Sequence, residues 1–246
     1  MTRPVNAGYL PLARRATAEF IGTAFLVMAV VGSGIAAASL SPADPGLQLL
    51  ENSLATGAAL TALILALQPV SAAFNPVVTL VERALGAIGT VETAVLIGVQ
   101  LAGGIAGCVL ANLMFDLHAV TLSTHNRSTG GHWLGEVVAT LGLLLVIFGA
   151  ARTGRSNKVA FAVGGYISAA YWFTSSTSFA NPAVTVARMF SNSFSGIAPA
   201  SVFPFVAMQL LGGLIAYAAI RLLYPGVVEL ADVHERSPHL TLAMKG

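Results

Sequence analysis

Charged residues are scarce in this chain. Lys, Arg, Asp and Glu make up 9% of its 246 residues and hydrophobic residues make up 56%, whereas a soluble globular domain carries roughly 25% charged residues. The chain lacks the polar surface to face water on all sides, so we interpret it as a membrane protein with several spans. It has one cysteine, Cys108, which excludes a disulfide framework and a cysteine-based metal cluster. The net charge is only +2 and the basic residues are scattered along the chain, so the sequence lacks the basic patch that is typical of nucleic-acid binding.

Six long apolar runs predict six transmembrane helices, because roughly 20 apolar residues cross a bilayer of about 30 Å. The first run follows Arg14 and Arg15 without a small-residue cleavage site, so we interpret it as a retained span and not as a signal peptide. We expect residues 1–225 to form one membrane domain and residues 226–246 to form a disordered cytoplasmic tail. The runs cover residues 16–38, 49–68, 91–115, 133–151, 158–174 and 201–224.

Basic residues are distributed unevenly between the two sides of these spans. Only Arg127 and Arg188 fall on the side opposite the termini. By the positive-inside rule, both termini are therefore expected in the cytoplasm. The ten on the side of the termini are Arg3, Arg14, Arg15, Arg83, Arg152, Arg155, Lys158, Arg221, Arg236 and Lys245.

Three short motifs occur twice and in the same order. A glutamate lies near the start of spans one and four, an Asn-Pro pair follows spans two and five, and a glutamine precedes two glycines in spans three and six. Each half, about 14–115 and 133–224, holds three spans, an odd number, so the second half must insert upside down and form an inverted repeat. The repeated residues are Glu19 and Glu136, Asn75-Pro76 and Asn181-Pro182, and Gln100 and Gln209.

Each Asn-Pro pair begins a segment too short to cross the membrane. Residues 76–85 and 182–190 would form only about 15 Å of helix at roughly 1.5 Å per residue, and Asn at the N-cap with Pro at the first position favours a helix start. We predict two half-helices that enter from opposite faces and meet at their N-termini near the midplane. Because irregular backbone survives there only beside protein or a water-filled path, the sequence implies a pore. The facing helix dipoles would repel cations, and the amides of Asn75 and Asn181 would donate hydrogen bonds to a passing solute.

These motifs resemble those of the aquaporin (major intrinsic protein) family. The resemblance extends from about residue 14 to 224 and depends on Asn75-Pro76-Val77 and Asn181-Pro182-Ala183, with the repeated glutamates and glutamines at matched positions. It implies an all-α membrane fold with six transmembrane helices and two re-entrant half-helices. It also implies a homotetramer in the lipid bilayer, here of a bacterial inner (plasma) membrane, with one pore per subunit and passive flux of water or small neutral solutes. No enzyme activity, cofactor or metal is expected.

The chain departs from the family pattern at the pore. Ala73 stands where the family usually has His, and Val77 where it usually has Ala in its first Asn-Pro-Ala motif. Three residues after Asn181, where the family normally has the Arg of its outer constriction, this chain has Val184. Arg188 is one helical turn further on, so we do not expect it to replace that Arg directly.

The other constriction positions are assigned by the same resemblance. They fall on Thr56 in span two, on Ser178 in the loop before Asn181, and on either Ala169 or Tyr171 in span five. The resulting filter would be wider than a water-selective one and uncharged. It resembles the filter of aquaglyceroporins associated with bacterial arsenic-resistance operons, which implies passage of arsenite, of methylated arsenicals and of glycerol. The alternative is an ordinary water or glycerol channel with no metalloid role.

Several polar residues leave two interpretations open. Buried acids in a membrane suggest proton or cation sites, but Glu19 and Glu136 are expected instead to brace the loops before the half-helices. Gln100 and Gln209 line the permeation path or brace the same loops. A histidine series on the outer loop binds a metal, senses pH or is simply solvated. It comprises His118, His125 and His132.

Overall fold

The computed structural model describes residues 10–152 and 158–224, which form eight α-helices. The tail at 226–246 and Arg3, Arg155, Arg236 and Lys245 lie outside the described residues. The all-α prediction with two half-helices is confirmed. The helices are α1 (Leu12–Leu40), α2 (Pro45–Leu67), α3 (Pro76–Ala84), α4 (Thr90–Met114), α5 (Gly130–Arg152), α6 (Val159–Phe173), α7 (Pro182–Arg188) and α8 (Pro199–Leu223).

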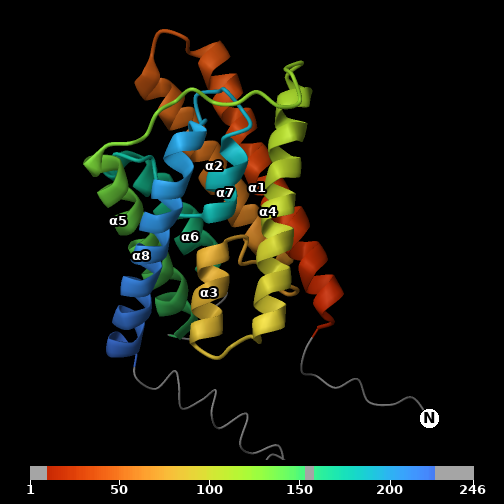
Figure 1. Cartoon of the computed structure of the whole chain (residues 1–246), viewed down its shortest axis with the longest axis vertical. Coiled ribbons are helices and arrows are strands. Elements are labelled where there is room, and N and C mark those ends of the chain that lie inside the picture. Colours follow the sequence, from red (N-terminus) through yellow and green to blue (C-terminus); the bar gives the residue numbers. More distant parts are fainter. Residues whose placement is uncertain (1–9, 153–157, 225–246) are drawn as a thin grey trace, which may run out of the picture.

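The helices form a bundle in which α3 and α7 lie at different heights between longer helices (Figure 1). We call the end where α1 begins and α8 ends the terminal face, and the opposite end, crossed by the connection from α4 to α5, the loop face. The half-helix α3 occupies the terminal half of the bundle and α7 the loop half. Helix α1 packs on α4 and α5 packs on α8, so each repeat has the same internal arrangement.

Five of the six predicted spans are long and apolar enough to cross a membrane, and the sixth is shorter. Helix α6 has 15 residues, about 22 Å at 1.5 Å per residue, because it ends at Phe173 and the chain turns toward Asn181. The half-helices are also slightly shorter than the predicted 76–85 and 182–190.

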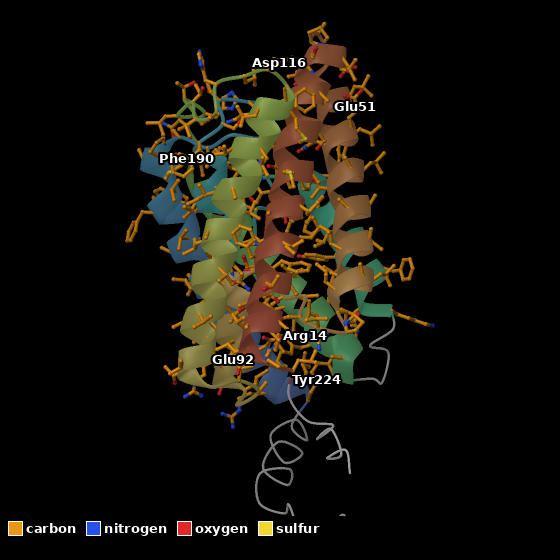
Figure 2. The ribbon with its side chains drawn as sticks, turned by 90° about the vertical axis from the view of Figure 1, so that its right-hand side faces the viewer. Arg14, Glu51, Glu92, Asp116, Phe190 and Tyr224 are labelled. Carbon is orange, nitrogen blue, oxygen red and sulfur yellow. The ribbon has the colours of Figure 1, made fainter. Side chains whose placement is uncertain are left out.

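Charged and apolar side chains are segregated along the bundle. Arg14 and Glu92 lie near the terminal face, whereas Glu51 and Asp116 lie near the loop face (Figure 2). Between these ends, large apolar side chains point outward from the helices, which is the arrangement that a lipid environment stabilises. Examples on different helices are Phe25, Leu54, Phe161, Phe203 and Leu214.

Paired glycines allow the helices of each repeat to approach closely. A Cβ at Gly103 on α4 would lie 2.4 Å from the carbonyl oxygen of Phe20 on α1, and one at Gly212 on α8 would lie 2.6 Å from the carbonyl oxygen of Val137 on α5. Both obstructing atoms belong to backbone that cannot move aside easily. The two repeats therefore use the same small-residue contact to fix the helices that carry Gln100 and Gln209.

Candidate pore and its constriction

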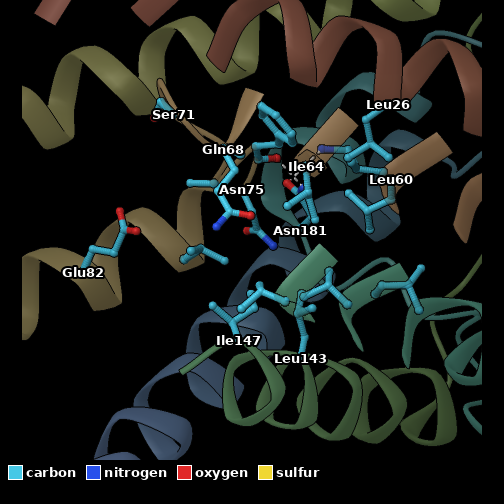
Figure 3. Close-up of a pocket in the computed structure, with 18 of the residues that line it drawn as sticks. Leu26, Leu60, Ile64, Gln68, Ser71, Asn75, Glu82, Leu143, Ile147 and Asn181 are labelled. Carbon is cyan, nitrogen blue, oxygen red and sulfur yellow. Dashed lines mark hydrogen bonds between the residues drawn. The ribbon is translucent and has the colours of Figure 1, made fainter. Parts of the chain in front are cut away.

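The two half-helices are joined by reciprocal hydrogen bonds between their caps. Asn75 Nδ2 donates to the carbonyl oxygen of Ala180 at 2.8 Å, and Asn181 Nδ2 donates to that of Phe74 at 2.7 Å. Each Asn also caps its own helix, because its Oδ1 accepts from the backbone N–H two residues later, at Val77 or Ala183. An amide nitrogen carries two hydrogens, so one N–H of each Asn remains for a solute at the centre of the cavity (Figure 3).

Glu19 holds the loop before α3. Its carboxylate accepts hydrogen bonds from the backbone N–H groups of Ala73 and Phe74 at 2.8 and 2.7 Å, and from Gln100 Nε2 at 2.8 Å. Gln100 Nε2 also lies 3.0 Å from Thr79 Oγ1 on α3. The glutamate thus accepts hydrogen bonds from both the loop and α4, and ties them together.

Glu136 makes the matching contacts in the second repeat. It accepts from the backbone N–H groups of Phe179 and Ala180, both at 2.9 Å, and from Gln209 Nε2 at 2.6 Å. Gln209 Nε2 in turn donates to Thr185 Oγ1 on α7 at 2.8 Å. Both glutamines are fully buried and in contact with a glutamate, and neither lies among the residues that line the cavity described below.

The loops held in this way contain unfavourable backbone. Phe74 and Ala180, each directly before the capping Asn, both have a φ of 48°, a region that costs a residue with a Cβ about 1–3 kcal/mol. The backbone N–H of both residues donates to a glutamate. We conclude that the buried carboxylates hold this conformation.

A cavity of about 550 Å³ runs past the two asparagines. At its terminal end it reaches the exposed residues Gln68 and Ala87, and at its loop end it reaches Tyr171 and Arg188. Polar groups at Ser71, Asn75 and Asn181 mark one side of the wall, and apolar side chains cover most of the rest (Figure 3). The apolar wall includes Leu26, Val30, Leu60, Ile64, Leu143, Ile147, Val163 and Ile167.

The loop end of the cavity brings together four residues assigned to the filter: Thr56, Tyr171, Ser178 and Val184 all line it. Thr56 Oγ1 lies 3.1 Å from the Tyr171 hydroxyl. Ala169 is exposed and does not line the cavity. Two residues correspond to about 200° around a helix with 3.6 residues per turn, so Ala169 and Tyr171 face opposite ways and Tyr171 alone of the two candidates reaches the cavity.

Arg188 also lines this end of the cavity, although sequence analysis assigned it no role there. Residues four apart lie on one helix face, so Arg188 follows Val184 on the cavity side of α7. Its Cζ lies 3.4 Å from the centroid of the Phe179 ring, and its Nε donates to the carbonyl oxygen of Ser195. The loop end is therefore neither free of aromatic groups nor uncharged. Arg188 is seven residues after Asn181, or about two helical turns, and so lies on the same helix face. This spacing was the sequence signal that could have placed it in the cavity.

The histidine series does not form a metal site in the described part of the chain, where no three His, Cys, Asp or Glu side chains are grouped to hold an ion. His132 instead packs its ring 6.4 Å from that of Phe205. The carbonyl oxygen of His125 accepts a hydrogen bond from the backbone N–H of Ala198.

The bracing network predicts the effect of Glu136→Gln. A glutamine would present one NH₂ group to a site where every neighbour is a donor, and each lost hydrogen bond to a charged group costs about 1.5–3 kcal/mol. We expect lower thermal stability in detergent and reduced solute flux in proteoliposomes. Glu51→Gln is the control, because Glu51 accepts a single side-chain hydrogen bond within residues 10–152 and 158–224, from the Ser41 hydroxyl to Oε1. Unchanged melting and flux in Glu136→Gln would contradict the bracing role.

Comparison with known proteins agrees with this geometry. The family model described as "Major intrinsic protein" matches residues 8–169 and 152–244. The chain is 49% identical over 211 residues to aquaglyceroporin AqpS of Rhizobium meliloti (strain 1021), covering 85% of this chain and 90% of that protein. Aquaporin A of Dictyostelium discoideum is 32% identical over 59% of this chain and 56% of its own length.

A solved structure shows the same fold. The aquaglyceroporin from Plasmodium falciparum aligns with a TM-score of 0.68, at 20% identity, over 89% of this chain and 100% of that one. Together with the two family matches, the paired half-helices and the cavity that they face, this assigns the chain. It belongs to the major intrinsic protein family, whose members are membrane channels for small uncharged solutes and not enzymes.

Proposed function

We propose that the protein is an aquaglyceroporin that conducts arsenite as uncharged As(OH)₃, and with it methylated arsenicals, glycerol and water. The observation that carries the proposal is the residue three after Asn181. Val184 lines the cavity with its apolar side chain, at the position where the family normally has the Arg that narrows its pore. The name of the relative AqpS, an aquaglyceroporin, supports the same class of solute.

The chemistry of the wall suits hydroxylated neutral solutes. The hydroxyls of Thr56 and Tyr171 offer hydrogen bonds at the loop end, and the free N–H groups of Asn75 and Asn181 offer them at the centre. The opposite apolar wall accommodates carbon or arsenic. A neutral molecule with several hydroxyls exchanges its water for these donors at little cost, whereas an ion loses far more hydration free energy.

The direct test is arsenite uptake into proteoliposomes without an ion gradient, compared with empty liposomes. We expect equilibration faster than in the empty control, with no accumulation above equilibrium. Uptake at the control rate, with rapid glycerol or water flux in the same vesicles, would overturn the arsenite proposal and favour the ordinary water or glycerol channel. Accumulation driven by an imposed gradient would indicate an active transporter, and no flux of any solute would indicate a structural protein.

Val184→Arg tests the filter argument. A guanidinium at this position would enter the cavity beside Tyr171, so we expect arsenite and glycerol flux to fall about tenfold or more, a factor equivalent to 1.4 kcal/mol of added barrier, with a smaller fall in water flux. Val184→Leu is the matched control, because it adds one methylene and no charge. An equal loss of all three fluxes in a correctly folded Val184→Arg protein would indicate general blockage.

We further propose a homotetramer in a bacterial inner membrane with the terminal face in the cytoplasm. Exposed basic residues on that face, among them Arg14, Arg83 and Lys158, support the orientation by the positive-inside rule. We expect a mass of four chains by native mass spectrometry. A cysteine introduced at Lys158 should not react with a membrane-impermeant thiol reagent in intact cells and should react once the cytoplasmic side is opened to the reagent. A monomeric mass would contradict the assembly, and labelling from outside would contradict the orientation.

A further inference from the structure

The two half-helices carry opposite charges at equivalent positions. Arg188 is the seventh residue after Asn181, and Glu82 is the seventh residue after Asn75. Residues spaced by three, then four, share one helix face. That face lines the cavity in both repeats, as Asn75, Val78 and Glu82 on α3 and as Asn181, Val184 and Arg188 on α7.

Arg188 brings a charge to the loop end of the lumen. Its side chain is 1% exposed, and only its Nε has a hydrogen-bond partner among residues 10–152 and 158–224, the carbonyl oxygen of Ser195. The four N–H groups of its terminal NH₂ nitrogens are donors without a protein acceptor in that part of the chain. The Phe179 ring holds the guanidinium of Arg188 by a cation–π contact. The centroid of the same ring lies 5.0 Å from Cζ of Arg127, so a second cation shares this ring with Arg188.

Glu82 brings the opposite charge to the terminal end. It is half-buried in the cavity wall. Its backbone carbonyl oxygen accepts a hydrogen bond from the N–H of Ala87, and the charge of Arg15 attracts its carboxylate. Arg15 also lines this end and forms an ion pair with Glu92, so its charge is shared between Glu92 and Glu82. Figure 3 shows Glu82 on α3 beyond Asn75, away from the centre of the cavity.

Helix stability does not account for Glu82. It lies in the last turn of α3, where a negative charge interacts unfavourably with the helix dipole. Its neighbour Arg83, which suits that end of the helix, is exposed and hydrogen-bonded to Thr90 Oγ1. An acid at position 82 is therefore better explained by the cavity that it lines.

We propose that Arg188 and Glu82 form a two-sign ion barrier, in which Arg188 rejects cations at the loop end and Glu82 rejects anions at the terminal end. An ion of either sign meets one repelling charge in a lumen whose low-dielectric walls strengthen the repulsion. A neutral solute is repelled by neither. The pore can then be wide at Val184 without leaking ions, because rejection depends on charge and not on diameter. The inference depends on the channel function above, but not on which neutral solute passes.

The test measures ion permeability of the assembled channel in planar bilayers, with separate sodium and chloride gradients. We expect Arg188→Gln to raise sodium permeability and Glu82→Gln to raise chloride permeability. The rise should be about tenfold or more in each case, as estimated for removing a unit charge about 10 Å from an ion at an effective dielectric constant of about 20. The double variant should conduct both ions. Arg188→Lys keeps the charge and should keep sodium out.

Arg83→Gln is the matched control, because it removes a charge from α3 that does not line the cavity. It should leave both ion permeabilities unchanged. Glycerol flux measured in the same preparations shows that each variant still forms an open pore, and flux of the unmodified protein tests the channel function separately.

Three outcomes would overturn the proposal: unchanged sodium permeability in Arg188→Gln with glycerol flux retained, equal sodium leakage in Arg188→Lys and Arg188→Gln, or unchanged chloride permeability in Glu82→Gln. If Arg188→Gln fails to assemble, the chloride measurement on Glu82→Gln decides alone.

Discussion

The whole pore depends on keeping two strained loops in place at the middle of a membrane. Each half-helix must begin there, so the chain before it has to reverse direction where water cannot satisfy its backbone. The structure meets this constraint with one buried carboxylate per repeat, which collects the backbone N–H groups of the strained loop. The glycine contacts of α4 and α8 and the buried glutamines serve the same end, because they position the helices around each carboxylate.

Selectivity follows from what surrounds this fixed centre. The asparagine caps are bound to each other's loops and leave one donor each for a solute. Toward its two ends the pore is lined by the cavity faces of α3 and α7, where a substitution would alter size or charge at a distance from the braced loops. Val184 and Arg188 lie one turn apart on such a face, so bulk and charge are separated along the path.

The fold was predictable from the sequence because its signals are local and repeated. Apolar length gives the spans, Asn-Pro gives each half-helix start, and an odd number of spans per repeat forces the inversion. Side-chain placement was harder to predict. Counting residues back from Asn181 could not decide between Ala169 and Tyr171, because the length of the loop before Asn181 was unknown. In the structure, α6 turns Tyr171 toward the cavity and Ala169 away from it.

Arg188 shows a second limit of sequence reasoning. Counting by motif position put it one turn beyond the expected Arg, which is correct, but the consequence depends on how far the cavity extends along α7. That distance is set by packing of the loop around Phe179 and Ser195, residues that the motif does not include. Glu82 escaped notice for the same reason, because its meaning depends on its counterpart in the other repeat.

The connection between the repeats is hydrogen-bonded at its start to Asn112 on α4 and over the rest of its length to the second repeat. The backbone N–H groups of Thr121 and Ser123 donate to the carbonyl oxygens of Phe190 and Met189, and Arg127 binds the carbonyl oxygens of Gly196 and Ser176. The boundary between the two halves of the molecule therefore lies near Val120, before the middle of the polar loop. Split there, the gene would encode two polypeptides, each with three long helices, one half-helix and its own glutamate brace, that meet where α2 packs on α6 and through the half-helices. The covalent link would then serve chiefly to deliver both halves to the membrane in equal number and opposite orientation.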